Sequence, residues 1–373
     1  MGFPERVQRI QGLLRSQGLD AAMFFSPANL AYIANFYPHT PWYPADLWRL
    51  APVIVPSDGD PIIVGTTVST KRLQDTCWIR DIRSYDEYTQ DGPAFISKVL
   101  KEEGLAESRI GIEEQILVVR TMMELTAQVP GVKWADAAEL MLEVRAVKEP
   151  QELDTMREAG EIIVKGMKAA IEAVKPGVLE RDVAATAEHA MRVAGAERFT
   201  EETMVLSGWR TLFTRDRARG KTIEAGDTVI LDMGCIHEGY CLDIARTVFC
   251  GTPKPDHRRV FELNVRVHQE TLQKIRPGIT GHELDGYARA RYAASEFPNA
   301  HPAHLVGHGI GLEFHERPVI MMGNQGALEA GMTFACEPSI RVPGITGIRI
   351  ENNVIVTGDG YEILDKEVPI SFL

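Results

Sequence analysis

Apolar positions in the first third of the chain follow two alternating spacings. Short apolar runs, three of them with β-branched residues, predict four strands: "DAAMFF" (20–25), "APVIVP" (51–56), "DPIIVG" (60–65) and "RIGIEE" (109–114). Apolar residues that recur every three to four positions predict amphipathic helices over 4–18 and 93–104, each ending at a glycine. Strands that alternate with helices predict a domain of mixed α/β structure.

The pattern changes near Lys148. A long amphipathic helix is predicted to begin here, with a proline near its start and a Pro-Gly pair after its end. We therefore expect two domains, 1–147 and 148–373, the number that a chain of 373 residues predicts. The first contains an aromatic, proline-rich segment at 35–48, which is either a rigid packed loop or the wall of a binding site.

The second domain contains an internal repeat. The stretch "EAGDTVILD" (224–232) is followed 105 positions later by "EAGMTFACE" (329–337). Each stretch comes after two predicted helices with Pro-Gly between them, and each begins a predicted β-hairpin. We interpret this order as a duplication, in which Asp232 and Glu337 occupy equivalent places.

The first hairpin, within 228–249, carries one aspartate on each strand. If its turn is centred between His237 and Glu238, Asp232 faces Asp243 across the antiparallel pair. Facing carboxylates lie about 4.5–5.5 Å apart at Cβ, so their charges should repel. A lone acid beside a turn is usually a turn or edge residue. Two acids that face each other repel, so another group must compensate their charges.

The second hairpin repeats this arrangement. With its turn near Pro343-Gly344, Glu337 faces Glu351. If the hairpins pack together, four carboxylates converge, and each charge pair at about 4 Å costs about 4 kcal/mol at an effective dielectric near 20. Raised pKa values would relieve part of this repulsion, whereas two divalent cations would neutralise all four acids. The pattern therefore predicts a metal site.

A nitrogen ligand is expected from a histidine-rich stretch. Four of the ten histidines fall within 301–318: His301, His304, His308 and His315. A lone histidine is more often an ordinary core or surface residue, but here Gly307, Gly309 and Gly311 permit close backbone approach. The stretch lacks the spacing and the strand–turn–helix setting of a dinucleotide fingerprint.

Composition narrows the class of protein. The chain is 45% hydrophobic and 25% charged, which is ordinary for a soluble globular protein. Its net charge of -12, without a basic stripe, argues against a nucleic-acid partner. We expect no membrane span and no signal peptide, and hence a cytoplasmic protein. The five cysteines are odd in number and lack a C-x-x-C pair, so buried core thiols are favoured over a zinc site.

The motifs taken together resemble a known family. "LDMG", "DIART", "LVGHGIGLEFHE", "CEP" and "RIENN" occur in this order, and the set resembles the pita-bread metallopeptidases, in the branch of prolidase, aminopeptidase P and creatinase. The resemblance covers 148–373, and the first domain resembles this branch in its size and strand–helix content. It implies a creatinase-like N-terminal α/β domain, an α+β pita-bread catalytic domain with pseudo-two-fold symmetry, and a homodimer.

The resemblance also implies roles for individual residues. Glu337 would act as general base or proton shuttle, His304 and His315 would contact the substrate and the tetrahedral intermediate, and Arg349 would support the ligands. Two divalent ions, of Mn, Co, Zn or Fe, would be bound, with the second aspartate bridging them. The five implied ligands are Asp232, Asp243, His308, Glu337 and Glu351.

The chain departs from the family pattern in three places. Arg215 stands where the peptidases carry a substrate-binding histidine, 17 residues before Asp232. Ala245 replaces a hydroxyl residue of the usual "DITRT", and asparagines follow Glu351 where an acid is common. None of these changes removes an implied ligand, but the first bears on specificity.

Two roles for Arg215 remain open. It either pairs with a nearby acid, such as Asp216 or Glu224, and faces water, or it lines the pocket and selects a substrate with a free carboxylate. The expected activity is hydrolysis of an amide bond in a small peptide, of Xaa-Pro type. The alternatives are a creatinase-like C–N hydrolase of a small amide or amidine, and a non-catalytic binding module.

Overall fold

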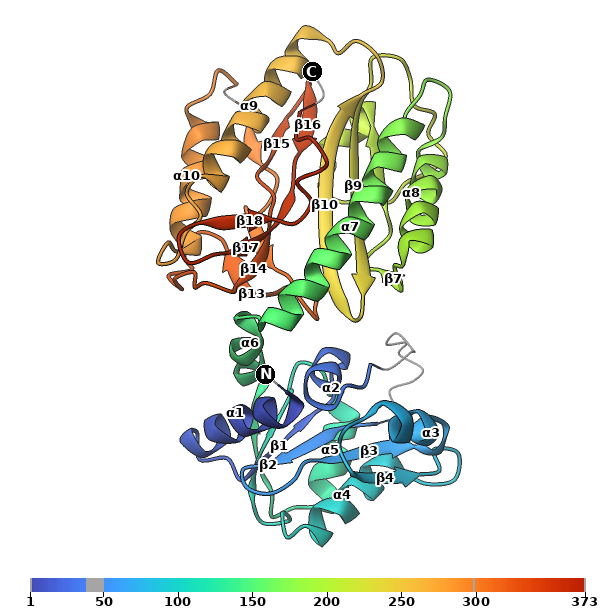
Figure 1. The fold of residues 1–373 in the computed structure, drawn as a ribbon, viewed down its shortest axis with the longest axis vertical. Coiled ribbons are helices and arrows are strands. Elements are labelled where there is room, and N and C mark those ends of the chain that lie inside the picture. Colours follow the sequence, from blue (N-terminus) through green and yellow to red (C-terminus); the bar gives the residue numbers. More distant parts are fainter. Residues whose placement is uncertain (1, 38–49, 298, 372–373) are drawn as a thin grey trace. The chain divides into compact units, whose positions relative to one another are not determined.

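The computed structural model describes residues 2–37, 50–297 and 299–371 of the chain. From residue 38 onwards, the aromatic segment predicted at 35–48 lies outside these ranges. The chain divides into two compact units, 1–144 and 145–373 (Figure 1). Within the described ranges, none of the helices is long and apolar enough to cross a membrane.

The first unit is a six-stranded mixed sheet with helices around it, in the strand order β4-β3-β2-β1-β5-β6. The strands and helices predicted from the apolar spacing are confirmed, and α1 buries Val7, Ile10 and Leu14, which share one helix face. The strands are β1 Ala21–Phe24, β2 Val53–Pro56, β3 Ile62–Thr66, β4 Asp81–Tyr85, β5 Arg109–Ile112 and β6 Lys133–Asp136. The helices are α1 Phe3–Ser16, α2 Pro27–Ala34, α3 Thr67–Thr76, α4 Gly92–Glu102, α5 Val119–Gln128 and α6 Ala138–Ala146.

The second unit contains two helix pairs and three sheets. Proline at the first position of α7 fixes a helical φ, and side-chain bonds between Glu149 and Glu152 cap its free N–H groups. The helices are α7 Pro150–Ala173, α8 Glu180–Ala194, α9 Pro255–Leu272 and α10 Gly281–Ala293. A short 3-10 helix, η2, spans Gly208–Leu212. In Figure 1 the pair α7 and α8 and the pair α9 and α10 lie on opposite sides of the strands.

The sheets of this unit have the orders β10-β9-β7, with β8 also on β9, β11-β15-β16, and β13-β12-β14-β17-β18. Apolar side chains such as Phe261, Leu284 and Phe334 fill the space between α9, α10 and the strands. The strands of the first repeat are β7 Arg198–Phe199, β8 Met204–Ser207, β9 Thr228–His237 and β10 Tyr240–Phe249. Those of the second are β11 His301–Pro302, β12 Gly307–Gly309, β13 Glu316–Ile320, β14 Thr333–Cys336, β15 Ser339–Val342, β16 Thr346–Arg349, β17 Asn352–Val356 and β18 Tyr361–Ile363.

The two repeats make equivalent backbone contacts. The Pro-Gly turn after each long helix bonds to the residues before each "EAG" motif: Gly177 N–H donates to Ile223 O, and Gly278 N–H donates to Leu328 O. The glycine of each "EAG" motif has a φ of 89°, which side-chain-bearing residues rarely adopt. The predicted pseudo-two-fold arrangement is therefore present at the level of hydrogen bonds.

The register predicted for the first hairpin was wrong by two positions. Asp232 lies opposite Ala245 and not opposite Asp243. The turn consists of Glu238 and Gly239, with φ of 46° and 82°, as a two-residue type I′ turn requires. Because side chains alternate between faces, a shift of two positions keeps both aspartates on the same face. They are diagonal neighbours, so the acids still converge.

The second hairpin has the predicted register. Strands β15 and β16 pair around Gly344, and β14 and β17 continue the same alignment, with Cys336 opposite Asn352. Glu337 and Glu351 occupy the facing positions in the gap between these two ladders. The interruption frees both glutamates from the ladder of their own hairpin.

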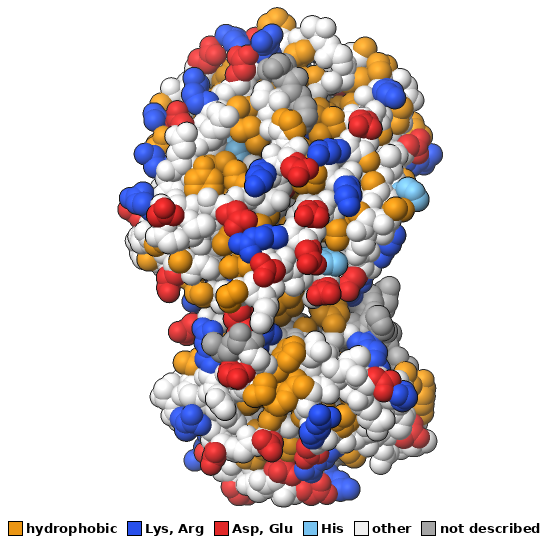
Figure 2. Space-filling model, in the orientation of Figure 1, with side chains coloured by type: hydrophobic (Ala, Val, Ile, Leu, Met, Phe, Trp, Pro, Cys, Tyr) orange, Lys and Arg blue, Asp and Glu red, His pale blue; other side chains and the backbone are white. Residues whose placement is uncertain are grey.

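Acidic and basic side chains are interspersed over the second unit on the face shown in Figure 2. The buried charges of this unit are arranged differently. Lys148 and Glu316 form an ion pair in which each side chain is only 1% exposed, and Arg145 Nη2 lies 3.4 Å from the second oxygen of Glu316. This cluster ties the start of α7 to β13. All five cysteines are free and buried, as predicted.

Replacing Lys148 by methionine is expected to destabilise the protein by about 3–5 kcal/mol, because Glu316 would keep its buried charge without its closest partner. Chemical denaturation of both proteins measures the difference. The matched control is Lys168→Met on α7, since Lys168 pairs with Glu367 at 3.1 Å on the surface, where ion pairs contribute about 0–1 kcal/mol. Equal denaturation midpoints for the two variants would contradict this view of the cluster.

Candidate metal centre

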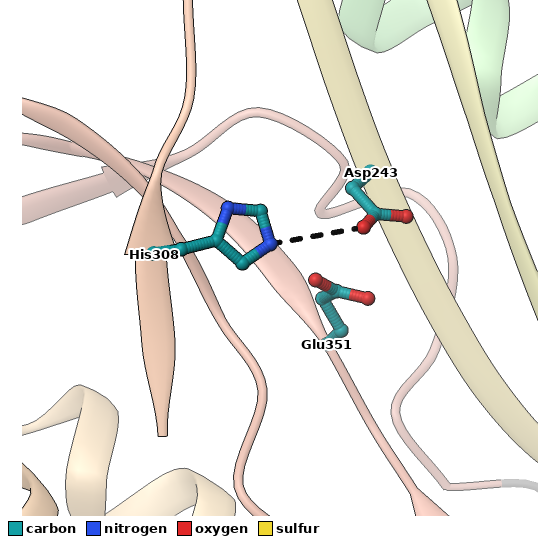
Figure 3. Close-up of side chains that lie close together, drawn as sticks. All are labelled: Asp243, His308 and Glu351. Carbon is teal, nitrogen blue, oxygen red and sulfur yellow. Dashed lines mark ion pairs between the residues drawn. The ribbon is translucent and has the colours of Figure 1, made fainter. Parts of the chain in front are cut away.

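The second unit brings the predicted metal ligands together from five segments. Nε2 of His308 lies 3.9 Å from Oδ2 of Asp243 and 3.8 Å from Oε1 of Glu337. Figure 3 shows the imidazole directed at Asp243 with the carboxylate of Glu351 beside them, and ligand atoms of these three lie within 4.8 Å of one another. The five segments contribute Asp232 on β9, Asp243 on β10, His308 on β12, Glu337 after β14 and Glu351 after β16.

Several oxygens in this cluster lack a hydrogen-bond donor. Among the described residues, no partner exists for Oδ1 of Asp232, Oδ1 of Asp243 or either carboxylate oxygen of Glu351, and all of these atoms are buried. A buried polar atom without a partner is costly, and charged ones are the most costly. Divalent cations would satisfy these oxygens. A donor set of mostly carboxylates with one imidazole fits Mn, Co, Fe or Zn.

Two glycines let the strand that carries His308 approach its neighbours. A Cβ at Gly307 would lie 2.3 Å from the carbonyl oxygen of Ala335, and one at Gly309 would lie 2.3 Å from the backbone of Arg317. Any side chain would therefore push β12 away from β14 or β13. The close approach predicted for this glycine-rich stretch is confirmed at these two positions.

A backbone contact fixes which nitrogen of His308 faces the acids. Nδ1 lies 3.1 Å from the carbonyl oxygen of Gly309 and must carry the proton, because a carbonyl can only accept. Burial, reinforced by the neighbouring His315, lowers the pKa of His308 to about 3, so the ring is neutral. Its Nε2 lone pair is therefore directed at Asp243 and Glu337, as a metal ligand requires.

The two glutamates are held by segments outside their own hairpin. Glu337 N–H donates to Val306 O at 2.8 Å, and Glu351 N–H donates to Ala245 O at 3.0 Å. The second of these bonds joins the two repeats, since Ala245 lies on β10. It places Glu351 beside the aspartates of the first repeat.

Burial dominates the electrostatics of the acids. It raises the pKa of Asp243 and of Glu351 well above the usual range, and neighbouring carboxylates add to the effect. It also raises the pKa of Glu337 to about 8, against the opposing effect of the Arg349 guanidinium. Because these three pKa values are raised, metal binding would release protons from the acids.

A cavity of about 250 Å³ opens onto the cluster and contains His304 and His315. Nε2 of His304 lies 3.4 Å from Oε2 of Glu337. The ring of His315 stands edge-on to that of His308, with 4.2 Å between centroids. Burial lowers the pKa of His304 to about 3 and lowers that of His315 as well, so both rings are neutral. Both therefore face the space where a substrate would lie.

Arg349 contacts the centre through Asp232. Its Nη1 donates to Oδ2 of Asp232, and its Nη2 donates to Thr214 O at 2.8 Å. Both charged side chains are buried, so the guanidinium fixes the orientation of the carboxylate and offsets part of its charge. The supporting role that the family resemblance implies for Arg349 remains a prediction.

Arg215 lines the same cavity, and its ion-pair partner is neither Asp216 nor Glu224. Its Nη2 lies 3.9 Å from Oε2 of Glu201, and its side chain is 64% exposed. Asp216 instead pairs with Arg210, at 2.8 Å. The acid that Arg215 pairs with is thus Glu201 and neither of the two named as examples, while its exposed side chain and its place in the cavity leave both roles considered for it open.

Sequence patterns did not indicate Glu201. One of its carboxylate oxygens lies within 4.8 Å of ligand atoms of both Asp232 and Asp243. It belongs to the loop between β7 and β8, and β8 pairs with β9 so that Met204 faces Asp232. This strand pairing brings the loop to the metal centre. No local sequence motif indicates the position of Glu201.

The asparagines that follow Glu351 also support the centre. Oδ1 of Asn353 accepts the backbone N–H of Asp243 at 3.0 Å. Its amide nitrogen donates to Asp365 at 2.9 Å, and Asp365 is fully buried. Asn353, which stands where an acid is common, therefore has an acidic partner in Asp365, 12 positions later in the chain. The sequence spacing did not indicate this pair.

Two regions of the chain match models of known families. Residues 154–358 match metallopeptidase family M24. Residues 6–147 match the creatinase/prolidase N-terminal domain. The metal centre lies within the first of these matches, and the six-stranded sheet lies within the second.

Relatives and solved structures match over nearly the whole length. The Xaa-Pro dipeptidase of Lactobacillus delbrueckii subsp. lactis is 29% identical over 358 residues, with 95% of each chain covered. That of Pyrococcus horikoshii is 29% identical, with 97% of each chain covered. The structure of an Xaa-Pro dipeptidase from Bacillus anthracis gives a TM-score of 0.90 at 26% identity, over 100% of this chain and 99% of that one. The prolidase structure from Pyrococcus horikoshii OT3 gives 0.87 at 27%, over 97% and 98%.

Proposed function

Because the chain belongs to metallopeptidase family M24, we propose that it is a dinuclear metal-dependent peptidase that hydrolyses Xaa-Pro bonds in small peptides. The observation that carries the proposal is the position of Asp243, which belongs to two groups of potential ligands at once. The full-length similarity to Xaa-Pro dipeptidases supports the substrate class. We assign 1–147 to the creatinase-like N-terminal domain and 148–373 to the catalytic domain.

Asp243 is proposed to bridge two ions. One group joins it to His308 and Glu351, and the other joins it to Asp232, each within 4.8 Å. When bound, two such ions polarise the scissile carbonyl and lower the pKa of the attacking water. The proposed ligands are Asp232, Asp243, His308, Glu337 and Glu351, and the metal is Mn, Co, Zn or Fe.

Glu337 is proposed to move the proton. Its carboxylate lines the cavity and lies 3.8 Å from Nε2 of His308, so it is placed to accept a proton from water and pass it to the leaving nitrogen. Nδ1 of His304 donates to Leu305 O at 2.7 Å, which leaves Nε2 to accept from Ser339 Oγ at 2.9 Å. Nε2 of His304 also lies 3.4 Å from Oε2 of Glu337, so it can accept a proton that Glu337 carries. His315 is proposed to contact the tetrahedral intermediate from the cavity.

Arg215 is proposed to select substrates that carry a free carboxylate, because its exposed guanidinium lines the cavity. Arg215→Ala is expected to raise KM for a free Xaa-Pro dipeptide and to change little for its carboxamide, since only the former can form a bidentate ion pair. The measurement is kcat/KM for both substrates at saturating metal. Arg215→His should move preference towards Xaa-Pro peptides, because the family resemblance implies a substrate-binding histidine at this position. Equal losses for acid and carboxamide would exclude this role.

A substrate screen tests the overall assignment. The metal-free protein is loaded with Mn, Co or Zn and offered Xaa-Pro dipeptides, longer Xaa-Pro peptides, and small N-acyl or cyclic amidine compounds. Cleavage confined to the last group would replace the peptidase by a creatinase-like C–N hydrolase. The homodimer remains a proposal from the family resemblance, which light scattering checks, and the cytoplasmic location remains a prediction.

A further inference from the structure

We propose that Glu201 is an additional ligand of the ion on the Asp232 side of the centre, and that Arg215 competes with the metal for its carboxylate. The inference rests on the metal-dependent function proposed above. It concerns Glu201, an acid that lines the cavity and that the family motifs did not include. It predicts that the two ions differ in their ligand chemistry.

The fold places the loop of Glu201 directly over β9. On one side of the loop Phe199 pairs with Cys235, and on the other Met204 pairs with Asp232. Four residues of the loop therefore span a stretch of β9 that contains only two, so the loop must bulge. A Cβ at Gly234 would lie 1.8 Å from Oγ1 of Thr200, so glycine is needed beneath the bulge.

Three carboxylates meet at the resulting position. Ligand atoms of Glu201, Asp232 and Asp243 all lie within 4.8 Å of one another. Oδ1 of each aspartate is buried and has no hydrogen-bond partner in the described part of the chain. These two orphaned oxygens are independent evidence for a cation, because they belong to side chains that are almost completely buried.

The cations that the protein itself supplies do not balance these acids. Arg349 donates to Oδ2 of Asp232, and so leaves Oδ1 free. Arg215 lies 3.9 Å from Oε2 of Glu201, and its side chain is largely exposed. Exposed ion pairs at this distance contribute little to stability. The ion pair with Arg215 is therefore too weak to offset the repulsion between Glu201 and the two buried aspartates. A divalent ion would offset it.

The charges around the centre leave room for a further acid. The four carboxylates among the proposed ligands would neutralise two divalent ions, and Arg349, Arg341 and Arg215 add positive charge around them. Glu201 supplies a negative charge on the Asp232 side. The ion on this side would have oxygen ligands only, which suits Mn²⁺, whereas His308 supplies a nitrogen to the other ion.

The test is a calorimetric titration of the metal-free full-length protein with Mn²⁺ alone, supported by metal analysis after dialysis. Glu201→Gln is expected to weaken one of the two Mn²⁺ sites by about 10–100-fold, in the range measured when a supporting group of a metal site is removed. Glu201→Asp keeps the charge on a shorter side chain and should give an intermediate affinity. Arg215→Ala should tighten the same site, because it removes the competing cation.

The matched control is Glu202→Gln. Glu202 is the next residue, its side chain is 71% exposed, and it pairs with Arg217 at 3.9 Å. The control changes the net charge equally without touching the cluster, so both Mn²⁺ sites should bind as in the wild type. If Glu202→Gln weakened binding as much as Glu201→Gln, the effect would be long-range charge and direct ligation would be excluded.

The remaining outcomes separate the two proposals. A wild-type protein that binds no Mn²⁺, Co²⁺ or Zn²⁺ would overturn the metal centre itself. A wild-type protein that binds two ions, with Glu201→Gln binding both equally well, would overturn only the role of Glu201. Circular dichroism of each metal-free variant verifies its fold, and unchanged spectra are expected because Glu201 belongs to a surface loop.

Discussion

Replacing Asp243 by alanine is expected to abolish hydrolysis and to remove most of the bound metal. The reason is that Asp243 is the one side chain shared by both groups of potential ligands. Its loss would separate the group of His308 and Glu351 from that of Asp232, and neither ion would keep its full set. His308→Ala should act in the same direction, because it removes the only imidazole among the proposed ligands.

The measurements are the metal content of the purified variants and their rate on an Xaa-Pro dipeptide. Asp154→Ala is a suitable control, because Asp154 is an exposed acid on α7 that pairs with Arg157 at 2.7 Å. It should keep both metal and rate. An Asp243→Ala protein with full metal content and normal turnover would show that the centre lies elsewhere.

The second large effect is expected for Glu337→Gln. Glutamine keeps the shape of the side chain, but it cannot accept a proton and it carries no charge. Turnover should fall by about a hundredfold or more, the usual contribution of a general acid–base group. The neutral side chain should fit the site, because burial already raises the pKa of Glu337 to about 8. The fold is therefore expected to remain intact.

Turnover must be compared at saturating metal, because the substitution also removes a ligand charge. Glu329→Gln is the matched control, since Glu329 is an exposed glutamate in the same "EAGMTFACE" stretch. It should turn over normally. Near-normal turnover of Glu337→Gln under these conditions would rule out the proton-transfer role and leave Glu337 as a ligand only.

Local sequence patterns predicted the elements well because their signals act within a few residues. The apolar spacing of 4–18 defines one helix face, and α1 buries that face. The Pro343-Gly344 turn fixes the second hairpin, and its register was predicted correctly. The register of the first hairpin was predicted wrongly because the predicted and the observed turn positions both leave the alternation of apolar residues unchanged. Only the left-handed conformation of Glu238 and Gly239 distinguishes the two.

The residues of the candidate metal centre were also found partly from the sequence and partly from the tertiary structure. The sequence alone determined that two matched hairpins carry four acids and that a glycine-rich stretch contains a candidate histidine ligand. Both follow from the internal repeat and from residue spacing, which are properties of the linear sequence. Only the tertiary structure decided that Glu201 lies beside Asp232 and that Arg215 pairs with Glu201. The physical reason is that these contacts depend on how β8 pairs with β9. Such pairing between distant segments is selected by packing and hydrogen bonding of the whole sheet, and no residue type or local period specifies it.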